Sequence, residues 1–277
     1  MGILKDKKIN QLIQSWPKDA ILTSEWIIHK MGYTKSHLQK YSRSGWIKLI
    51  GKGAYVCTGI DNQGIPLKKK QKIEWQSGVY AMQALRLNQK ATTPLVHIGG
   101  RSALELKGLA HFLSMSSKQS VSLFVQPTYR VPNWFKKNNW EANIHFFPSR
   151  LFSKPLPESF IEKDWGGFAT LMSCPERAIM EVLYLCPKHE SLDHAKLLME
   201  NLAGLRPKMV STLLQYCTSV KVKRLFLALA DICNHAWLSD VDVKNIDLGS
   251  GKRFIEAGQA FHPEYQISIP KTEEAKN

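Results

Sequence analysis

The segment from residue 20 to residue 56 constrains the fold most, because it contains the signals for two short helices followed by a β-hairpin. Thr23 and Thr34 are favourable N-cap residues, since a threonine hydroxyl accepts a hydrogen bond from the first turn of a helix. We therefore predict a helix beginning after each threonine, with Gly32 in the turn between them. A β-rich segment follows and bends at Gly51-Lys52-Gly53. This order of elements is typical of a winged helix-turn-helix, a unit that reads DNA.

The second predicted helix, which runs to about Ser44, carries side chains suited to DNA opposite its apolar Leu38 and Tyr41. One helix fits the major groove, where Gln pairs with adenine and Lys or Arg with guanine. We predict that Gln39 contacts adenine, that Lys35 or Arg43 contacts guanine, and that the other polar groups contact phosphates. The predicted DNA-binding residues are Thr34, Lys35, Ser36, Gln39, Lys40, Arg43, Lys52, Lys68, Lys69 and Lys70.

The positive charge of the chain is concentrated in the same region. The 277 residues carry a net charge of +15, which favours a polyanionic partner. Residues 1–72 hold 14 Lys and Arg against 4 Asp and Glu, a net charge of +10. The remaining residues hold 24 basic and 19 acidic side chains, a net charge of only +5. The charge distribution therefore supports a DNA-binding function for the N-terminal part.

The chain is long enough for two domains, and we predict a mixed α+β fold. Residues 1–66 form the winged helix-turn-helix, 67–74 a basic linker, and 75–277 a larger α/β domain. Helical periodicity predicts helices over 3–16, 75–89, 102–111, 191–202, 207–217 and 223–236, and another that begins near Pro175. Runs of β-branched and aromatic residues predict strands over 95–98, 121–125, 144–147, 168–172, 253–260 and 266–269.

Nothing in the sequence indicates secretion or membrane insertion. The five cysteines form no CxxC pair, which is typical of free thiols in a reducing compartment. The first residues lack the apolar run of a signal peptide, and no stretch approaches the ~18 apolar residues of a membrane span. We therefore expect a cytoplasmic protein.

No catalytic set stands out in the second region, and we expect neither an enzyme nor a bound metal or cofactor. The sequence Gly249-Ser250-Gly251-Lys252-Arg253 lacks the spacing of a phosphate-binding loop and is expected to be a glycine-rich turn. Gly99-Gly100-Arg101 joins a strand to a helix, where free amides and Arg101 are a candidate anion site, or simply a tight connection with a surface arginine. A second candidate surface, for nucleic acid or a partner, consists of Lys221, Lys223, Arg224, Lys252 and Arg253, unless these residues are merely solvated.

Several blocks of the sequence resemble the AbiEi antitoxins of bacterial abortive-infection toxin–antitoxin systems. The N-terminal block is LTSEWIIHKMGYTKSHLQKYSRSGWIKLIGKGAYV. The more specific blocks are VHIGGRSALELKGLAHFL, CPERAIMEVLYLCP, VKVKRLFLALADICNHAWL and IDLGSGKRFIEAGQAFHPEYQISIP. Together they extend over nearly the whole chain in the family's order.

The resemblance implies a repressor that binds inverted repeats in double-stranded DNA of its own promoter. Its C-terminal domain would counter a nucleotidyltransferase-like toxin, without the need for a stable complex, in defence against phage. The alternative is a winged-helix regulator of another system whose second domain binds a ligand or a protein. The sequence leaves open whether a dimer or two monomers occupy the operator.

Overall fold

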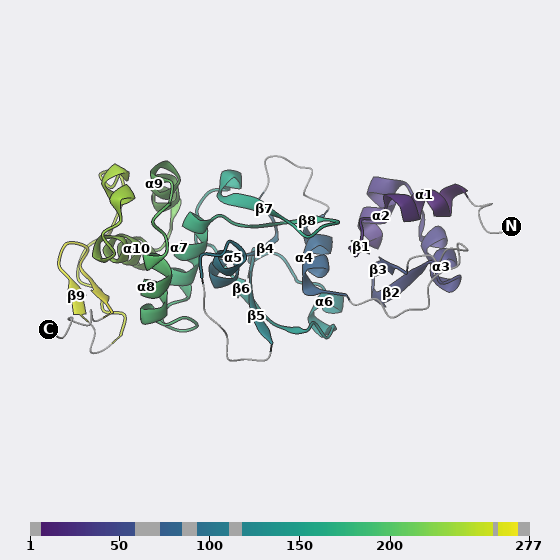
Figure 1. Ribbon diagram of the computed structural model, residues 1–277, viewed down its shortest axis with the longest axis horizontal. Coiled ribbons are helices and arrows are strands. Elements are labelled where there is room, and N and C mark those ends of the chain that lie inside the picture. The colour runs from purple at the N-terminus through teal and green to yellow at the C-terminus, as the bar shows by residue number, and fades with distance from the viewer. Residues whose placement is uncertain (1–6, 59–72, 85–92, 111–117, 257–259, 271–277) are drawn as a thin grey trace.

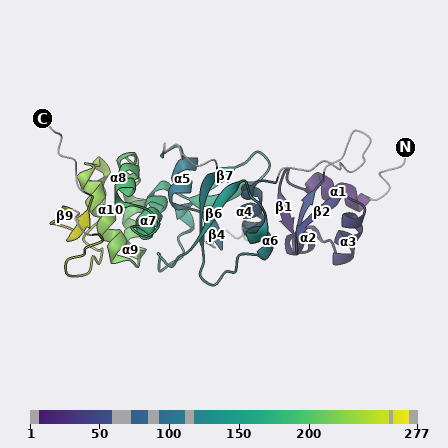
Figure 2. The same cartoon turned by 90° about the horizontal axis from the view of Figure 1, so that it is seen from below.

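The computed structural model describes residues 7–58, 73–84, 93–110, 118–256 and 260–270. In these residues the fold is mixed α+β, with an N-terminal domain followed by a larger C-terminal domain. The parts follow one another along an elongated molecule (Figure 1). The N-terminal elements lie at one end, a five-stranded sheet in the middle and a group of helices at the other end, and the perpendicular view in Figure 2 shows the same order.

The N-terminal domain consists of three helices and a small sheet. An antiparallel sheet of order β1-β3-β2 packs against the helices around buried Leu12, Ile27, Leu38 and Tyr41. The elements are α1 (Lys7–Ser15), β1 (Ile21–Thr23), α2 (Ser24–Met31), α3 (Lys35–Arg43), β2 (Ile47–Gly51) and β3 (Ala54–Cys57). The two predicted helices and the predicted hairpin are therefore present, and β1 is an additional strand that pairs with β3.

The C-terminal domain begins with a helix and a mixed sheet of order β6-β5-β4-β8-β7. The pair β4–β5 is antiparallel, β4–β8 and β5–β6 are parallel, and β7–β8 is antiparallel. The elements are α4 (Trp75–Gln83), β4 (Val96–Ile98), α5 (Gly100–Leu106), β5 (Gln119–Val125), α6 (Asn133–Lys137), β6 (Ala142–Pro148), β7 (Phe160–Asp164) and β8 (Ala169–Ser173). The sequence pattern did not predict α6 and β7, because both elements are short and half-exposed.

A group of helices completes the domain beyond the sheet. The longest, α10 (Val220–Ile232), is buried nearly all round, and α7 packs against both it and α5. The other elements are α7 (Pro175–Leu185), α8 (Leu192–Glu200), α9 (Pro207–Tyr216), β9 (Ala260–His262) and β10 (Ile267–Ile269). The helix predicted from residue 223 begins at Val220 instead, because Ser219 caps its first turn.

The two domains are packed directly against each other. Ile21 and Val56 of the N-terminal sheet belong to the hydrophobic core of the C-terminal domain, and Tyr80 of α4 belongs to the N-terminal core. The backbone of Gly51, at the hairpin turn, lies against Trp134 of α6, so that a Cβ atom there would be 2.5 Å from the Trp134 Cβ. Only glycine permits this close approach, so a residue far away in the sequence, Trp134, is the reason that position 51 requires glycine.

We expect a Gly51→Ala substitution to lower the free energy of unfolding by about 1–3 kcal/mol, because overpacking forces the backbone or Trp134 to shift. Gly204→Ala is a matched control, since a Cβ at Gly204 would meet no atom within 4 Å. Chemical denaturation of both variants measures the difference. Equal stability of the two variants would show that the contact between the hairpin and α6 contributes nothing.

Candidate nucleic-acid interface and adjoining cavity

The helix α3 is fixed at its start by a reciprocal capping arrangement. The Thr34 hydroxyl accepts a hydrogen bond from the His37 amide, and His37 Nδ1 accepts one from the Thr34 amide at 3.2 Å. This is a capping box in which histidine occupies the position usual for Glu or Gln. The His37 ring also stacks on Tyr41, with ring centroids 6.0 Å apart. His37 therefore orients the helix and is only partly accessible.

The exposed side of α3 carries the residues predicted to bind DNA. Lys35, Gln39 and Arg43 are exposed and follow one another at intervals of four residues, so they lie along one ridge of the helix. Their side chains make no hydrogen bond or ion pair with the described residues, whereas Leu38 and Tyr41 are buried on the opposite side. Thr34, Ser36 and Lys40 are also exposed. The polar side of α3 is thus available to a large ligand.

The hairpin contributes further positive charge beside α3. Lys52 is exposed at its turn, as predicted, and Lys48 on β2 is an exposed lysine that the sequence reading did not single out. The turn is docked on α6 through Gly51 and is therefore not a free loop tip. Residues 34–57 contain five Lys and Arg and no Asp or Glu. The predicted contacts of Lys68, Lys69 and Lys70 lie outside the described residues.

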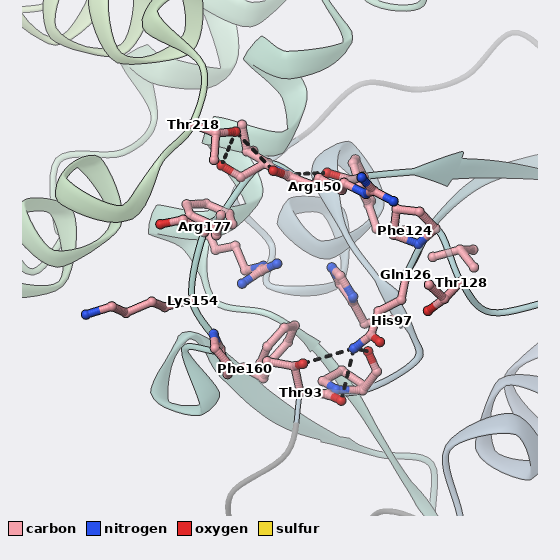
Figure 3. A pocket seen from close by; sticks show the side chains of 18 residues that line it. Thr93, His97, Phe124, Gln126, Thr128, Arg150, Lys154, Phe160, Arg177 and Thr218 are labelled. Atoms are coloured by element: carbon pink, nitrogen blue, oxygen red, sulfur yellow. Dashed lines mark hydrogen bonds between the residues drawn. The ribbon is translucent and has the colours of Figure 1, made fainter. Parts of the chain in front are cut away.

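A cavity of about 460 Å³ opens in the C-terminal domain, where β4, β5 and β7 approach the first turn of α7 (Figure 3). His97 and Phe124 come from the sheet, Phe160 from β7 and Arg177 from the first turn of α7. In Figure 3 the Arg177 guanidinium and the His97 ring approach the same space from two sides. The sequence reading assigned no role to this part of the domain.

A buried carboxylate organises the wall of this cavity. Glu181 is 1% exposed and accepts hydrogen bonds from His97 Nε2 at 2.8 Å, the Gly100 amide at 3.0 Å, Ser173 Oγ at 2.8 Å and Arg177 Nε at 2.8 Å. Burial alone would raise the pKa of Glu181, but His97 and Arg177 outweigh it and hold the pKa below its ordinary value. Burial lowers the pKa of His97. At neutral pH the group therefore contains a Glu181 carboxylate held between the Arg177 guanidinium and the His97 ring.

This arrangement corrects the predicted anion site at Gly99-Gly100-Arg101. The Gly100 amide already binds an anion, which is the protein's own Glu181. The side chain of Arg101 is paired with Glu105 at 3.2 Å and lies 3.9 Å from Glu190. The Gly100 amide is therefore not open to an external anion, and the Arg101 side chain is already engaged by two carboxylates.

Two of the five residues of the candidate basic surface in the C-terminal domain are buried, so they are neither part of a binding surface nor solvated. Lys223 and Arg224 are 6% and 3% exposed, and they donate to backbone carbonyls of the segment that follows the helices. Their acceptors are Asp247 for Lys223, and Leu248, Gly251 and Gln266 for Arg224.

The other three residues of that candidate surface differ in how far they are exposed. Lys221 is half-buried and donates to the carbonyls of Tyr184 and Cys186. Lys252 and Arg253 are exposed. The side chains of Lys221, Lys223 and Arg224 are thus bound to backbone carbonyls. Lys252 and Arg253 are the exposed members of the candidate surface.

The described residues contain no group of three His, Cys, Asp or Glu side chains that could hold a metal ion. No helix in the same part of the chain is long and apolar enough to cross a membrane.

Comparison with protein families defines the class of this protein. A model described as "Transcriptional regulator, AbiEi antitoxin N-terminal domain" matches residues 5–115. A second, described as "Transcriptional regulator, AbiEi antitoxin, Type IV TA system", matches residues 118–270. The protein is an antitoxin transcriptional regulator of a toxin–antitoxin system. The chain belongs to the AbiEi antitoxin family, as the resemblance of its sequence blocks predicted.

A solved structure shares the fold. The crystal structure of the RV2827C protein from Mycobacterium tuberculosis matches with a TM-score of 0.51 and 13% sequence identity. The match covers 94% of this chain and 89% of that chain. At this identity the likeness shows a common fold and nothing further. Comparison with curated proteins gives no significant match.

Proposed function

We propose that the N-terminal domain is a winged helix-turn-helix that represses the protein's own operon by binding inverted repeats in its promoter. The observation that carries this proposal is the polar ridge of α3, where Lys35, Gln39 and Arg43 are exposed and unengaged by the described residues. A helix with these side chains on one side and a buried apolar side fits the major groove. Gln39 and Arg43 would read bases, while Lys40 and Lys52 would contact phosphates.

The absence of acidic residues from 34–57 supports the same assignment, since carboxylates near the groove would repel the phosphates. The docked hairpin places Lys52 at the junction with α6, where Lys136 and Lys137 are also exposed. DNA that extends beyond the major groove occupied by α3 would bring its phosphates close to these three lysines. The DNA-binding surface is therefore proposed to continue from the hairpin on to the C-terminal domain.

We also propose that the C-terminal domain counters a nucleotidyltransferase-like toxin in a cytoplasmic system that aborts phage infection. Membership in the AbiEi antitoxin family supports this role, and the toxin need not form a stable complex with it. The domain is proposed to act by binding and not by catalysis. Among the described residues that line the cavity beside Glu181, no hydroxyl or thiol is hydrogen-bonded to His97, which pairs with Glu181 instead.

The DNA-binding proposal is tested by titrating the full-length protein on to a fragment of its own promoter at several salt concentrations. The expected result is specific binding that weakens as salt rises, with a log–log slope of about −0.9 for each phosphate contact. Binding that is equally tight to an unrelated fragment, or insensitive to salt, would contradict the proposed function of α3.

A further inference from the structure

The cavity beside Glu181 is lined by cationic side chains and by none of the described carboxylates. Its volume of about 460 Å³ lies within the range of small-molecule sites. Three cationic side chains line it, those of Arg150, Lys154 and Arg177, and no Asp or Glu occurs among its described lining residues. Its surface is therefore suited to an anion.

Arg177 is held in place as a preformed anion-binding group. Its guanidinium lies between two rings, with the central carbon 4.5 Å from the centroid of Phe152 and 4.4 Å from that of Phe160. Nε donates to Glu181 at 2.8 Å and Nη1 to Ser159 Oγ at 3.0 Å. Nη2 makes no hydrogen bond with the described residues. A guanidinium fixed in this way loses little conformational freedom when it binds an oxyanion.

The balance of charge indicates which anion fits. Glu181 neutralises Arg177 from behind the cavity wall, which leaves the charges of Arg150 and Lys154. The Arg150 side chain has no partner among the described residues. The Lys154 ammonium donates to the uncharged Tyr216 hydroxyl at 3.3 Å and lies 4.4 Å from the centre of that ring, contacts that leave its charge uncompensated. Two uncompensated positive charges match a phosphomonoester, which carries about −1.5 to −2 at pH 7.

We propose that this cavity binds a small phosphorylated organic molecule. The phosphate lies between Arg177 and Arg150, and the organic part packs against the apolar lining, to which Phe124 and Pro94 belong. Thr128 lines the same cavity and offers a hydroxyl to the ligand. The site is separate from the proposed DNA-binding surface, since none of its described lining residues belongs to α3, the hairpin or α6.

Isothermal titration calorimetry of the full-length protein tests this site with inorganic phosphate, ribose 5-phosphate and acetate at constant ionic strength. We expect saturable binding of phosphate, tighter binding of ribose 5-phosphate, and much weaker binding of acetate. Arg150→Gln should weaken phosphate binding about tenfold or more, because a charge-assisted hydrogen bond is lost. Arg150 has no side-chain partner among the described residues, so this variant should keep the melting temperature of the wild type.

Lys208→Ala is the matched control, because Lys208 is an exposed lysine outside both the cavity and the proposed DNA-binding surface. It should leave phosphate binding unchanged. Lys40→Ala shows whether phosphate binds at α3 instead. The proposal is wrong if Lys40→Ala abolishes binding while Arg150→Gln retains it, or if no saturable phosphate binding is seen. Acetate that binds as tightly as phosphate, or ribose 5-phosphate that binds no more tightly than phosphate, would equally overturn it. None of these results depends on whether the protein binds its promoter.

Discussion

A Lys40→Ala, Arg43→Ala double variant is expected to bind the protein's own promoter about 100-fold more weakly than the wild type. Both side chains are exposed on α3, where each contact with a base or phosphate contributes roughly 1–3 kcal/mol. The loss of a base contact at Arg43 should also change the preferred sequence. The lost phosphate contact of Lys40 should make the salt dependence shallower by about 0.9 in log–log slope. Equilibrium binding to promoter fragments with single-base changes measures all three effects.

The control variant for this experiment removes two positive charges from the C-terminal domain instead. Lys208 on α9 and Lys244 in the segment that follows α10 are both exposed, and α9 lies at the end of the molecule opposite α3 (Figure 1). A Lys208→Ala, Lys244→Ala variant should bind the promoter nearly as well as the wild type. Equal losses in the two double variants would mean that net charge, and not α3, determines affinity.

A Glu181→Ala substitution is expected to lower the free energy of unfolding by about 3–5 kcal/mol, because it leaves a buried cation and neutral donors without their acceptor. The carboxylate accepts four hydrogen bonds, from β4, α5, β8 and its own helix α7. Its removal therefore weakens several elements at once. Chemical denaturation gives the size of the effect, and Glu162→Ala, at an exposed position on β7, provides a control that should change little.

The same carboxylate predicts sensitivity to acid. Because the folded pKa of Glu181 lies below its ordinary value, its contribution to stability is present above the unfolded pKa. That contribution is lost as the pH falls through the folded pKa. The folded pKa of His97 is also lowered, so protonation of this buried ring opposes folding in the same direction.

Denaturation of wild type and Glu181→Gln at a series of pH values tests this linkage. The difference in stability between the two should shrink as the solution becomes acidic. A difference that stays constant down to the pH of acid unfolding would show that Glu181 is not ionised in the folded protein.

Local signals explain why the N-terminal domain was largely predictable. Thr23 and Thr34 cap α2 and α3 as expected, and Gly32 ends α2 with a left-handed φ of 73°. These features depend on residues within one helical turn of each other. The docking of Gly51 on Trp134 was not predictable, because it joins residues more than 80 positions apart.

The predictions for the C-terminal domain that were wrong have the same physical origin, since the interacting residues lie far apart in the sequence. Lys223 and Arg224 look like surface charges, yet carbonyl groups that follow much later in the chain accept their hydrogen bonds. One available signal was the apolar run from Leu225 to Ala230, since a helix that is apolar all round is buried. The role of Glu181 had no such signal. Its donors come from two distant parts of the chain, residues 97–100 and 173–177, and only the sheet brings them together.

We propose that one chain represses its promoter through α3 and counters a toxin through its C-terminal domain. This proposal is tested most directly by expressing the neighbouring toxin gene together with either the wild type or the Lys40→Ala, Arg43→Ala variant, in cells that carry a reporter under the native promoter. Both proteins are expected to restore growth, whereas only the wild type is expected to repress the reporter. Failure of the wild type to restore growth, or full repression by the double variant, would contradict it.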